Sequence, residues 1–228
     1  MTSCTNSRMV DGTDGPSPSA RIRTSVTIPV HLDTDTFSAE FVSFHGLVDS
    51  REHLALVFGN ALEQGVPLVR LHSECLTGDV FGSARCDCGP QLRESTKLLS
   101  ARVGLLLYLR QEGRGIGLYN KIDAYRLQDA GMDTFQANRA LNFDDDHRDY
   151  RVAAQMLCAF GIREIDLLTN KPAKAAQLTA CGITVRRRLP TGVHVTEANR
   201  RYLQAKVDRA SHIIDITGTR AAQTGVPE

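Results

Sequence analysis

Three cysteines close together are the residues of this chain that point most clearly to chemistry. Cys75 is followed after ten residues by Cys86, and one residue separates Cys86 from Cys88. Soft thiolates in this number suit a tetrahedral zinc ion, and no fourth cysteine lies nearby. Catalytic zinc usually has three protein ligands and a water, whereas structural zinc has four. The spacing therefore indicates an open zinc site, where bound water ionises near neutral pH and can attack an electron-poor carbon.

Other interpretations of the cysteines stay open at this point. His72 is near enough in the sequence to be the fourth ligand of a structural zinc, and the cysteines could also be plain reduced thiols. Residues 72–74 resemble the His-x-Glu half of the zinc nucleobase deaminases, in which the glutamate acts as general acid and base. The deaminase partner half, Pro-Cys-x-x-Cys, is missing here. A zinc deaminase is therefore a second hypothesis, and a non-enzymatic, zinc-stabilised binding module is a third.

The elements around these residues are predicted from periodicity and from turn residues. Short apolar or β-branched segments bounded by turn residues indicate strands at 26–30, 54–58 and 68–71. From about residue 90 the predicted elements alternate between helices and strands. Helical spacing and glycine stops predict helices over about 91–101, 116–131, 148–161 and 172–182, with strands at 104–109, 165–168 and 183–187.

This order predicts one compact α/β (mixed α+β) domain, with a β-rich first third followed by alternating helices and strands. We expect the domain to span residues 23–214, because no long linker interrupts it. Residues 1–22 and 215–228 are rich in small and polar residues, and both are predicted to be disordered tails.

Composition excludes several classes of function. The chain has 228 residues, 42% of them hydrophobic and 23% charged, which is typical of soluble globular proteins. A net charge of +1 gives no long-range attraction to nucleic acid or to an acidic membrane surface. No apolar run approaches the roughly 18 residues of a membrane helix, and the polar start lacks a signal-peptide core. We therefore expect a cytoplasmic protein that binds neither nucleic acid nor membrane.

Four segments together resemble a known family. HSECLTGDVFGSARCDCGPQL, RQEGRGIGLYNKIDAY, DDDHRDY and LLTNKPAK are similar to the signatures of GTP cyclohydrolase II, in the same order. The likeness covers roughly residues 40–214 and is weak around 191–201. Four motifs at compatible distances are far more specific than any one of them.

The resemblance implies a reaction. GTP would be opened at C8 of its imidazole ring, with release of formate and pyrophosphate. The product would be 2,5-diamino-6-(5-phosphoribosylamino)pyrimidin-4(3H)-one, in the first step of riboflavin biosynthesis. The family uses Zn²⁺, implying one ion per chain on Cys75, Cys86 and Cys88, and Mg²⁺ with the triphosphate, and it is commonly a homodimer. An alternative is a family variant that stops at the formamidopyrimidine or serves a specialised pathway.

The resemblance also implies the residues that contact GTP. Basic side chains among them can neutralise phosphates, and threonine can donate hydrogen bonds to phosphates. Glu112 is expected to accept hydrogen bonds from N1 and N2 of guanine. The full set is Arg70, Leu71, His72, Ser73, Glu74, Gln91, Glu112, Gly113, Arg114, Thr134, Thr169 and Lys174.

Three further residues correspond to catalytic positions of the family. Arg148 matches the proposed nucleophile towards the α-phosphorus, and Asp146 its proton acceptor. Because a guanidinium stays protonated at ordinary pH, Arg148 suits an electrostatic clamp equally well. The charged segment around both residues also has a plain interpretation as the first turn of the next helix. Periodicity places Tyr125 in the core, whereas the resemblance implies that it helps to complete deformylation, so free formate is expected.

Overall fold

The computed structural model describes residues 20–144, 146–200, 203, 204 and 207. Most of both predicted tails lies outside these residues. The described part forms a seven-stranded sheet with the order β1-β2-β3-β5-β4-β6-β7. The predicted fold class, a mixed α/β domain with a β-rich beginning, is therefore confirmed.

One half of the sheet is antiparallel. β1 and β2 form a long hairpin, and β2 and β3 continue it up to β5. The strand predicted at 26–30 is the middle of β1, which begins two residues inside the predicted N-terminal tail, and β2 was not predicted. These strands are β1 (Arg21–Leu32), β2 (Asp35–His45) and β3 (Leu54–Val57).

The other half of the sheet is parallel. β5, β4, β6 and β7 run in the same direction, so their carboxyl ends meet at one edge. The predicted strands at 68–71, 104–109, 165–168 and 183–187 all lie within this half. The bounds are β4 (Leu68–Ser73), β5 (Leu105–Leu109), β6 (Glu164–Leu168) and β7 (Thr184–Leu189).

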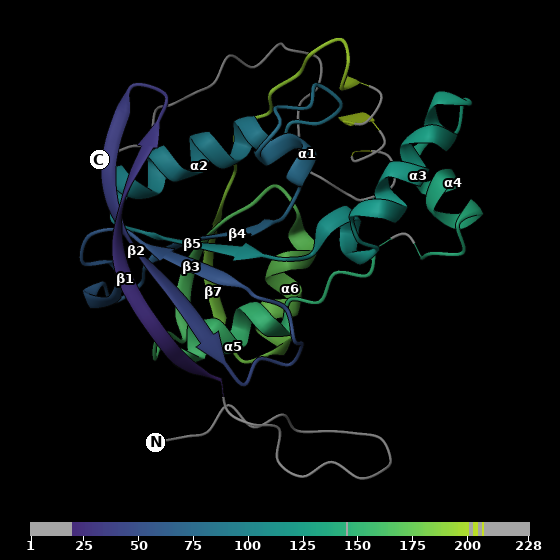
Figure 1. The fold of residues 1–228 in the computed structure, drawn as a ribbon. Helices are drawn as coiled ribbons and strands as arrows, with labels where there is room; N and C mark the ends of the chain where they lie inside the picture. Colours follow the sequence, from purple (N-terminus) through teal and green to yellow (C-terminus); the bar gives the residue numbers. More distant parts are fainter. Residues whose placement is uncertain (1–19, 145, 201–202, 205–206, 208–228) are drawn as a thin grey trace, which may run out of the picture.

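Helices cover both faces of the sheet (Figure 1). On one face, α2 (Cys88–Arg102) buries Leu99 in a cluster with Leu106 of β5. On the other, α5 (Arg151–Ala159) and α6 (Pro172–Ala180) pack against Leu105 and Leu107. Successive residues of a strand point to opposite faces, so the leucines of β5 supply both cores.

Further helices lie beyond the edge where the parallel strands end. There α1 (Leu76–Asp79) follows β4 and the 3₁₀ turn η2 (Glu112–Gly115) follows β5, whereas the 3₁₀ turn η1 (Ala61–Glu63) follows β3 at the opposite edge. The helix predicted over 116–131 is α3 (Leu118–Asp129), and an unpredicted α4 (Thr134–Ala140) packs beside it (Figure 1). α5 starts at Arg151 rather than near 148, so Arg148 lies in a loop and not in a first helical turn. In the described part of the chain, every helix is too short or too polar to cross a membrane.

Candidate active site

The carboxyl ends of the parallel strands open into one cleft. Ligands of such sheets bind outside the carboxyl ends of the strands. The cleft measures about 1200 Å³ when its open mouth is included. The segments after β4, β5, β6 and β7 each line it, with Glu74 and Cys75, Gln111 and Glu112, Thr169 and Asn170, and Thr191. The topology thus gathers side chains from four distant parts of the sequence around one space.

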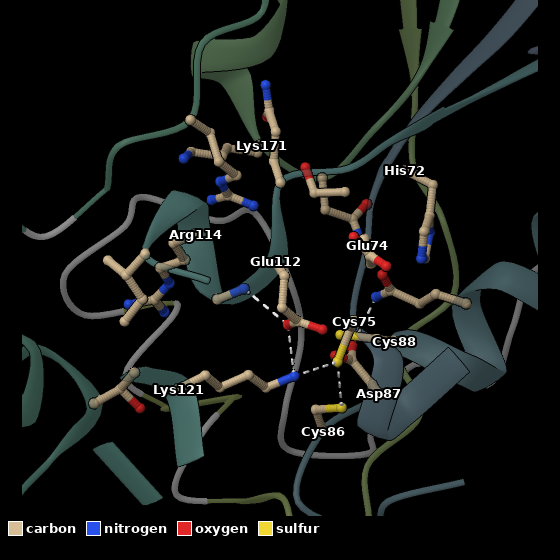
Figure 2. A pocket seen from close by; sticks show the side chains of 18 of the residues that line it. His72, Glu74, Cys75, Cys86, Asp87, Cys88, Glu112, Arg114, Lys121 and Lys171 are labelled. Carbon is tan, nitrogen blue, oxygen red and sulfur yellow. Dashed lines mark hydrogen bonds and ion pairs between the residues drawn. The ribbon is translucent and has the colours of Figure 1, made fainter. Parts of the chain in front are cut away.

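Cys75, Cys86 and Cys88 form one end of the cleft, called here the thiol end. The three Sγ atoms lie within 4.8 Å of one another, and those of Cys75 and Cys86 are 3.6 Å apart (Figure 2). Sulfurs that share a tetrahedral zinc ion at about 2.3 Å lie roughly 3.8 Å from one another. The spacing of the thiols therefore fits zinc.

Two of the thiols, Cys75 and Cys86, differ in acidity. Hydrogen bonds from Cys86 and Cys88, and the charge of Lys121, hold the pKa of Cys75 well below its usual range. The hydrogen bond with Cys75 raises the pKa of Cys86 to about 11. Cys75 therefore ionises before Cys86.

Two glycines allow the backbone to close around the thiols. A Cβ on Gly78 would lie 2.7 Å from the Sγ of Cys86 and 3.1 Å from that of Cys75. A Cβ on Gly89 would lie 2.2 Å from the carbonyl oxygen of Gly78. Real side chains do not approach so closely. Both positions therefore require glycine for α1 and α2 to meet at the cluster.

His72 supports the thiol end without joining it. Its Nε2 lies 3.1 Å from both carboxylate oxygens of Asp79, and its ring stacks on Tyr108. The backbone N–H of Cys75 donates to the same carboxylate at 2.9 Å, and so does the Tyr108 hydroxyl. Among the described residues, the group of possible ligand atoms around the thiols contains neither ring nitrogen of His72, so the interpretation of His72 as a fourth zinc ligand does not fit this geometry. His72 helps to hold the carboxylate that fixes the Cys75 backbone.

Glu112 is joined to the thiol end through hydrogen bonds within the protein. Its Oε1 accepts from Lys121 (Figure 2) and from the N–H of Gly113, both at 2.8 Å. Its Oε2 accepts from the N–H of Leu76 at 2.6 Å. A carboxylate oxygen offers about two acceptor positions. One position on Oε2 is therefore left for a further donor, and the expected contact of Glu112 with guanine N1 and N2 stays a prediction.

Tyr125 lies on α3 at the wall of the cleft, half-buried. Its hydroxyl is 3.4 Å from the Oγ1 of Thr77, the guanidinium of Arg85 is 4.9 Å from its ring centre, and the ammonium of Lys121 is 5.7 Å away. Burial raises the pKa of this hydroxyl, so it is protonated at neutral pH. Tyr125 is thus a cleft residue and not the core aromatic that periodicity predicted.

Arg114, Arg148 and Lys171 form a second part of the cleft, called here the cation end. Arg148 makes a paired contact with Asp146, at 2.8 Å from Nε and 2.6 Å from Nη2, and Lys171 contacts the same carboxylate. Burial opposes ionisation, yet the two cations hold the pKa of Asp146 well below its usual range. In Figure 2, Lys171 and Arg114 lie well apart from the labelled cysteines.

A left-handed turn brings the loop of Asp146 to the cleft. Gly113, Arg114 and Gly115 all have positive φ, and the carbonyl of Arg114 accepts the N–H of His147 at 2.9 Å. A Cβ on Gly115 would lie 2.9 Å from the Cβ of His147. The glycine-rich segment at 113–115 therefore has the backbone conformation and the space that let the loop of Asp146 approach the cleft.

Comparison with known proteins identifies the family. Residues 24–190 match the family model of GTP cyclohydrolase II. The GTP cyclohydrolase-2 of Vibrio vulnificus (strain CMCP6) is 52% identical over 198 residues, which cover 86% of this chain and 100% of that protein. The chain belongs to the GTP cyclohydrolase II family. Membership makes it an enzyme of the type that acts in riboflavin biosynthesis and removes the support for the deaminase hypothesis.

Two further curated relatives agree with this family. The GTP cyclohydrolase-2 of Psychromonas ingrahamii is 50% identical, over 85% of this chain and 97% of that protein. The riboflavin biosynthesis protein RibBA of Bacillus subtilis (strain 168) is 47% identical, over 82% of this chain and 48% of that protein. Among solved structures, RibBX of A. baumannii, a two-domain 3,4-dihydroxy-2-butanone 4-phosphate synthase, aligns at a TM-score of 0.41 and 20% identity, over 78% of this chain and 41% of that one.

The site residues expected from the GTP cyclohydrolase II motifs lie together. All of them line the cleft except Leu71 and Asp146. The Leu71 side chain is in the core, and its carbonyl oxygen accepts the ammonium of Lys174 at 2.6 Å. Asp146 contacts Arg148 and is not itself part of the cleft lining. Arg70 and Lys174 are both buried, and burial lowers the pKa of Lys174 well below its usual value.

Several residues that line the cleft were not predicted. Three of them are charged, and each bonds to a predicted residue: Lys121 to Cys75, Lys171 to Asp146 and Asp87 to Gln91. Gln111, Asn170 and Thr191 follow directly after β5, β6 and β7. Their position directly after a predicted parallel strand could therefore have identified Gln111, Asn170 and Thr191. No local sequence pattern distinguishes Lys121.

Proposed function

We propose that this protein hydrolyses GTP at C8 of its imidazole ring and releases formate and pyrophosphate, leaving 2,5-diamino-6-(5-phosphoribosylamino)pyrimidin-4(3H)-one. The observation that carries the proposal is one cleft that holds a zinc-compatible thiol cluster and a separate group of cations. The first suits attack on a ring carbon, and the second suits a triphosphate.

At the thiol end, zinc held by Cys75, Cys86 and Cys88 would supply a nucleophilic water at neutral pH. Tyr125 keeps its proton at this pH, because burial raises its pKa, so its hydroxyl can donate to the opening ring. The Lys121 ammonium and Thr77 hold Tyr125 and Glu112 around the same space. Glu112 offers guanine its remaining acceptor position.

At the cation end, Arg148 and Lys171 would bind the phosphate oxygens, with Arg114 beside them and Mg²⁺ on the triphosphate. A carboxylate with a depressed pKa is a weak base, so Asp146 suits orientation of Arg148 better than acceptance of a proton. We therefore assign Arg148 as an electrostatic clamp at the α-phosphorus. The homodimer and the cytoplasmic location stay predictions.

A metal analysis combined with a GTP assay tests the proposal. Formate and pyrophosphate should appear together from GTP, formate release should stop on chelation, and zinc should restore it. Formate that is unaffected by chelation would overturn the zinc assignment. Ammonia without formate would instead support a deaminase, and a formamide product would support the family variant that stops early.

A further inference from the structure

Lys121 is a buried lysine that none of the expected catalytic roles uses. It lies on α3, and its side chain is 11% exposed. Lysine is almost never buried unless it is paired. Its ammonium donates to the Sγ of Cys75 at 3.1 Å and to the Oε1 of Glu112 at 2.8 Å (Figure 2), and to the Oγ1 of Thr77 at 2.9 Å. All three hydrogens of the ammonium group therefore have partners.

The charge of the thiol end explains why a cation belongs there. Three thiolates around Zn²⁺ carry a net charge of −1, and Cys75 and Cys86 are buried. A buried charge without a partner is costly, and hydrogen bonds to a metal ligand tune and orient it. The ammonium at 3.1 Å from Cys75 balances this charge without occupying a coordination position.

The second contact of Lys121 acts on the backbone. Lys121 holds Oε1 of Glu112, and Oε2 of the same carboxylate accepts the N–H of Leu76, the residue directly after Cys75. Lys121 thus reaches Cys75 twice, once at the sulfur and once through Glu112 at the following peptide. Both contacts constrain where the Cys75 sulfur lies.

We propose that Lys121 is a positioning residue of the metal site: its ammonium supplies the counter-charge of the three thiolates and, through Glu112, fixes the Cys75 backbone. The inference rests on the zinc site of the proposed function but on none of its GTP chemistry. It assigns to α3 a role in holding metal, in addition to carrying Tyr125.

The test measures zinc affinity by competition with a chromophoric chelator, in the absence of GTP. Lys121→Met should weaken zinc binding by about tenfold or more, the usual effect of losing a partner of a metal ligand. Lys121→Arg keeps the charge and should stay within about threefold of the parent protein, whereas Lys121→Gln, which keeps only hydrogen bonding, should resemble the Met variant. Lys171→Met removes a cation of the same cleft that contacts Asp146, and its zinc affinity should equal that of the parent protein.

The outcomes separate the inference from its rivals. Unchanged zinc affinity in Lys121→Gln, or an equal loss in Lys171→Met, would overturn it. If Lys121→Met does not fold by circular dichroism, the comparison of the Gln and Arg variants decides alone. Because no substrate is present, a GTP assay that failed would contradict the proposed function and leave this result standing, and absence of zinc binding in the parent protein would overturn both.

Discussion

At the thiol end of the cleft the backbone is closely packed, whereas at the cation end charged side chains hold one another. Gly78 leaves no room for a Cβ beside the sulfurs of Cys75 and Cys86. Arg148 and Lys171 instead meet at the carboxylate of Asp146, in a loop between α4 and α5. The thiol end thus depends on close packing in addition to the charge of Lys121, whereas the cation end depends on charge.

The difference follows from what each end has to hold. A metal ion requires ligand atoms at fixed distances, which close packing can impose. A phosphate chain offers many oxygens, so cations that can adjust on long side chains suffice. Substitutions should therefore affect one chemistry while leaving the other nearly intact.

Cys86→Ser should give the largest effect. Loss of one of three thiolates removes the metal and several kcal/mol of catalysis, so formate release should fall by at least about 1000-fold. Pyrophosphate release from GTP should persist, because the cation end is untouched. Parallel assays of formate and pyrophosphate check this, and full formate production would contradict the metal assignment.

Arg148→Ala is the reciprocal change. Loss of a preorganised donor to the phosphoryl group should slow pyrophosphate release by about 100-fold or more, with zinc content unchanged. Arg148→Lys keeps the charge but not the paired contact with Asp146, and should recover part of the rate. A loss of zinc in Arg148→Ala would mean that the two ends are not independent.

Gly78→Ala tests whether shape governs the thiol end. The added methyl would lie 2.7 Å from the Cys86 sulfur, so zinc affinity should fall by about 10–100-fold, as for other disturbances around metal ligands. Gly65→Ala is the matched control, since its added Cβ meets nothing within 4 Å. Equal zinc affinity in both variants would contradict a close-packed thiol end.

Much of the site could be predicted because it lies in contiguous motifs. Four motifs, which occur along the chain in the family's order, contain the cysteines, Glu112 and Arg148. The strands of the parallel half were also predicted, because each is a short segment rich in apolar or β-branched residues between turn residues. By contrast, β2 was missed although Phe37, Ala39 and Phe41 alternate with polar residues, a signal typical of a half-buried strand.

Lys121 could not have been found in this way. Helical periodicity assigns apolar residues to the buried face, and on this helix that face would include Ile122, three residues before Tyr125. The structure instead exposes 50% of Ile122 and buries Lys121 and Ala124, because the face of α3 is turned towards thiols and a carboxylate. The partners of Lys121 come from other parts of the chain, and only the tertiary fold brings them together.

Asp146→Asn should give the smallest effect, on stability at the cation end. Arg148 and Lys171 depress the pKa of Asp146, so its stabilisation is complete above the unfolded pKa near 4 and declines as pH falls towards the folded pKa. At pH 7 the variant should melt about 2–4 °C lower, the shift that roughly 1 kcal/mol produces in a domain of this size. The difference should be constant from about pH 8 to 5 and shrink below about pH 4. Thermal melts of both proteins across this pH range check the direction of the change. If the difference in melting temperature widened as the pH fell, Asp146 would be protonated and hydrogen-bonded in another way. Charge would then not be what holds the cation end together.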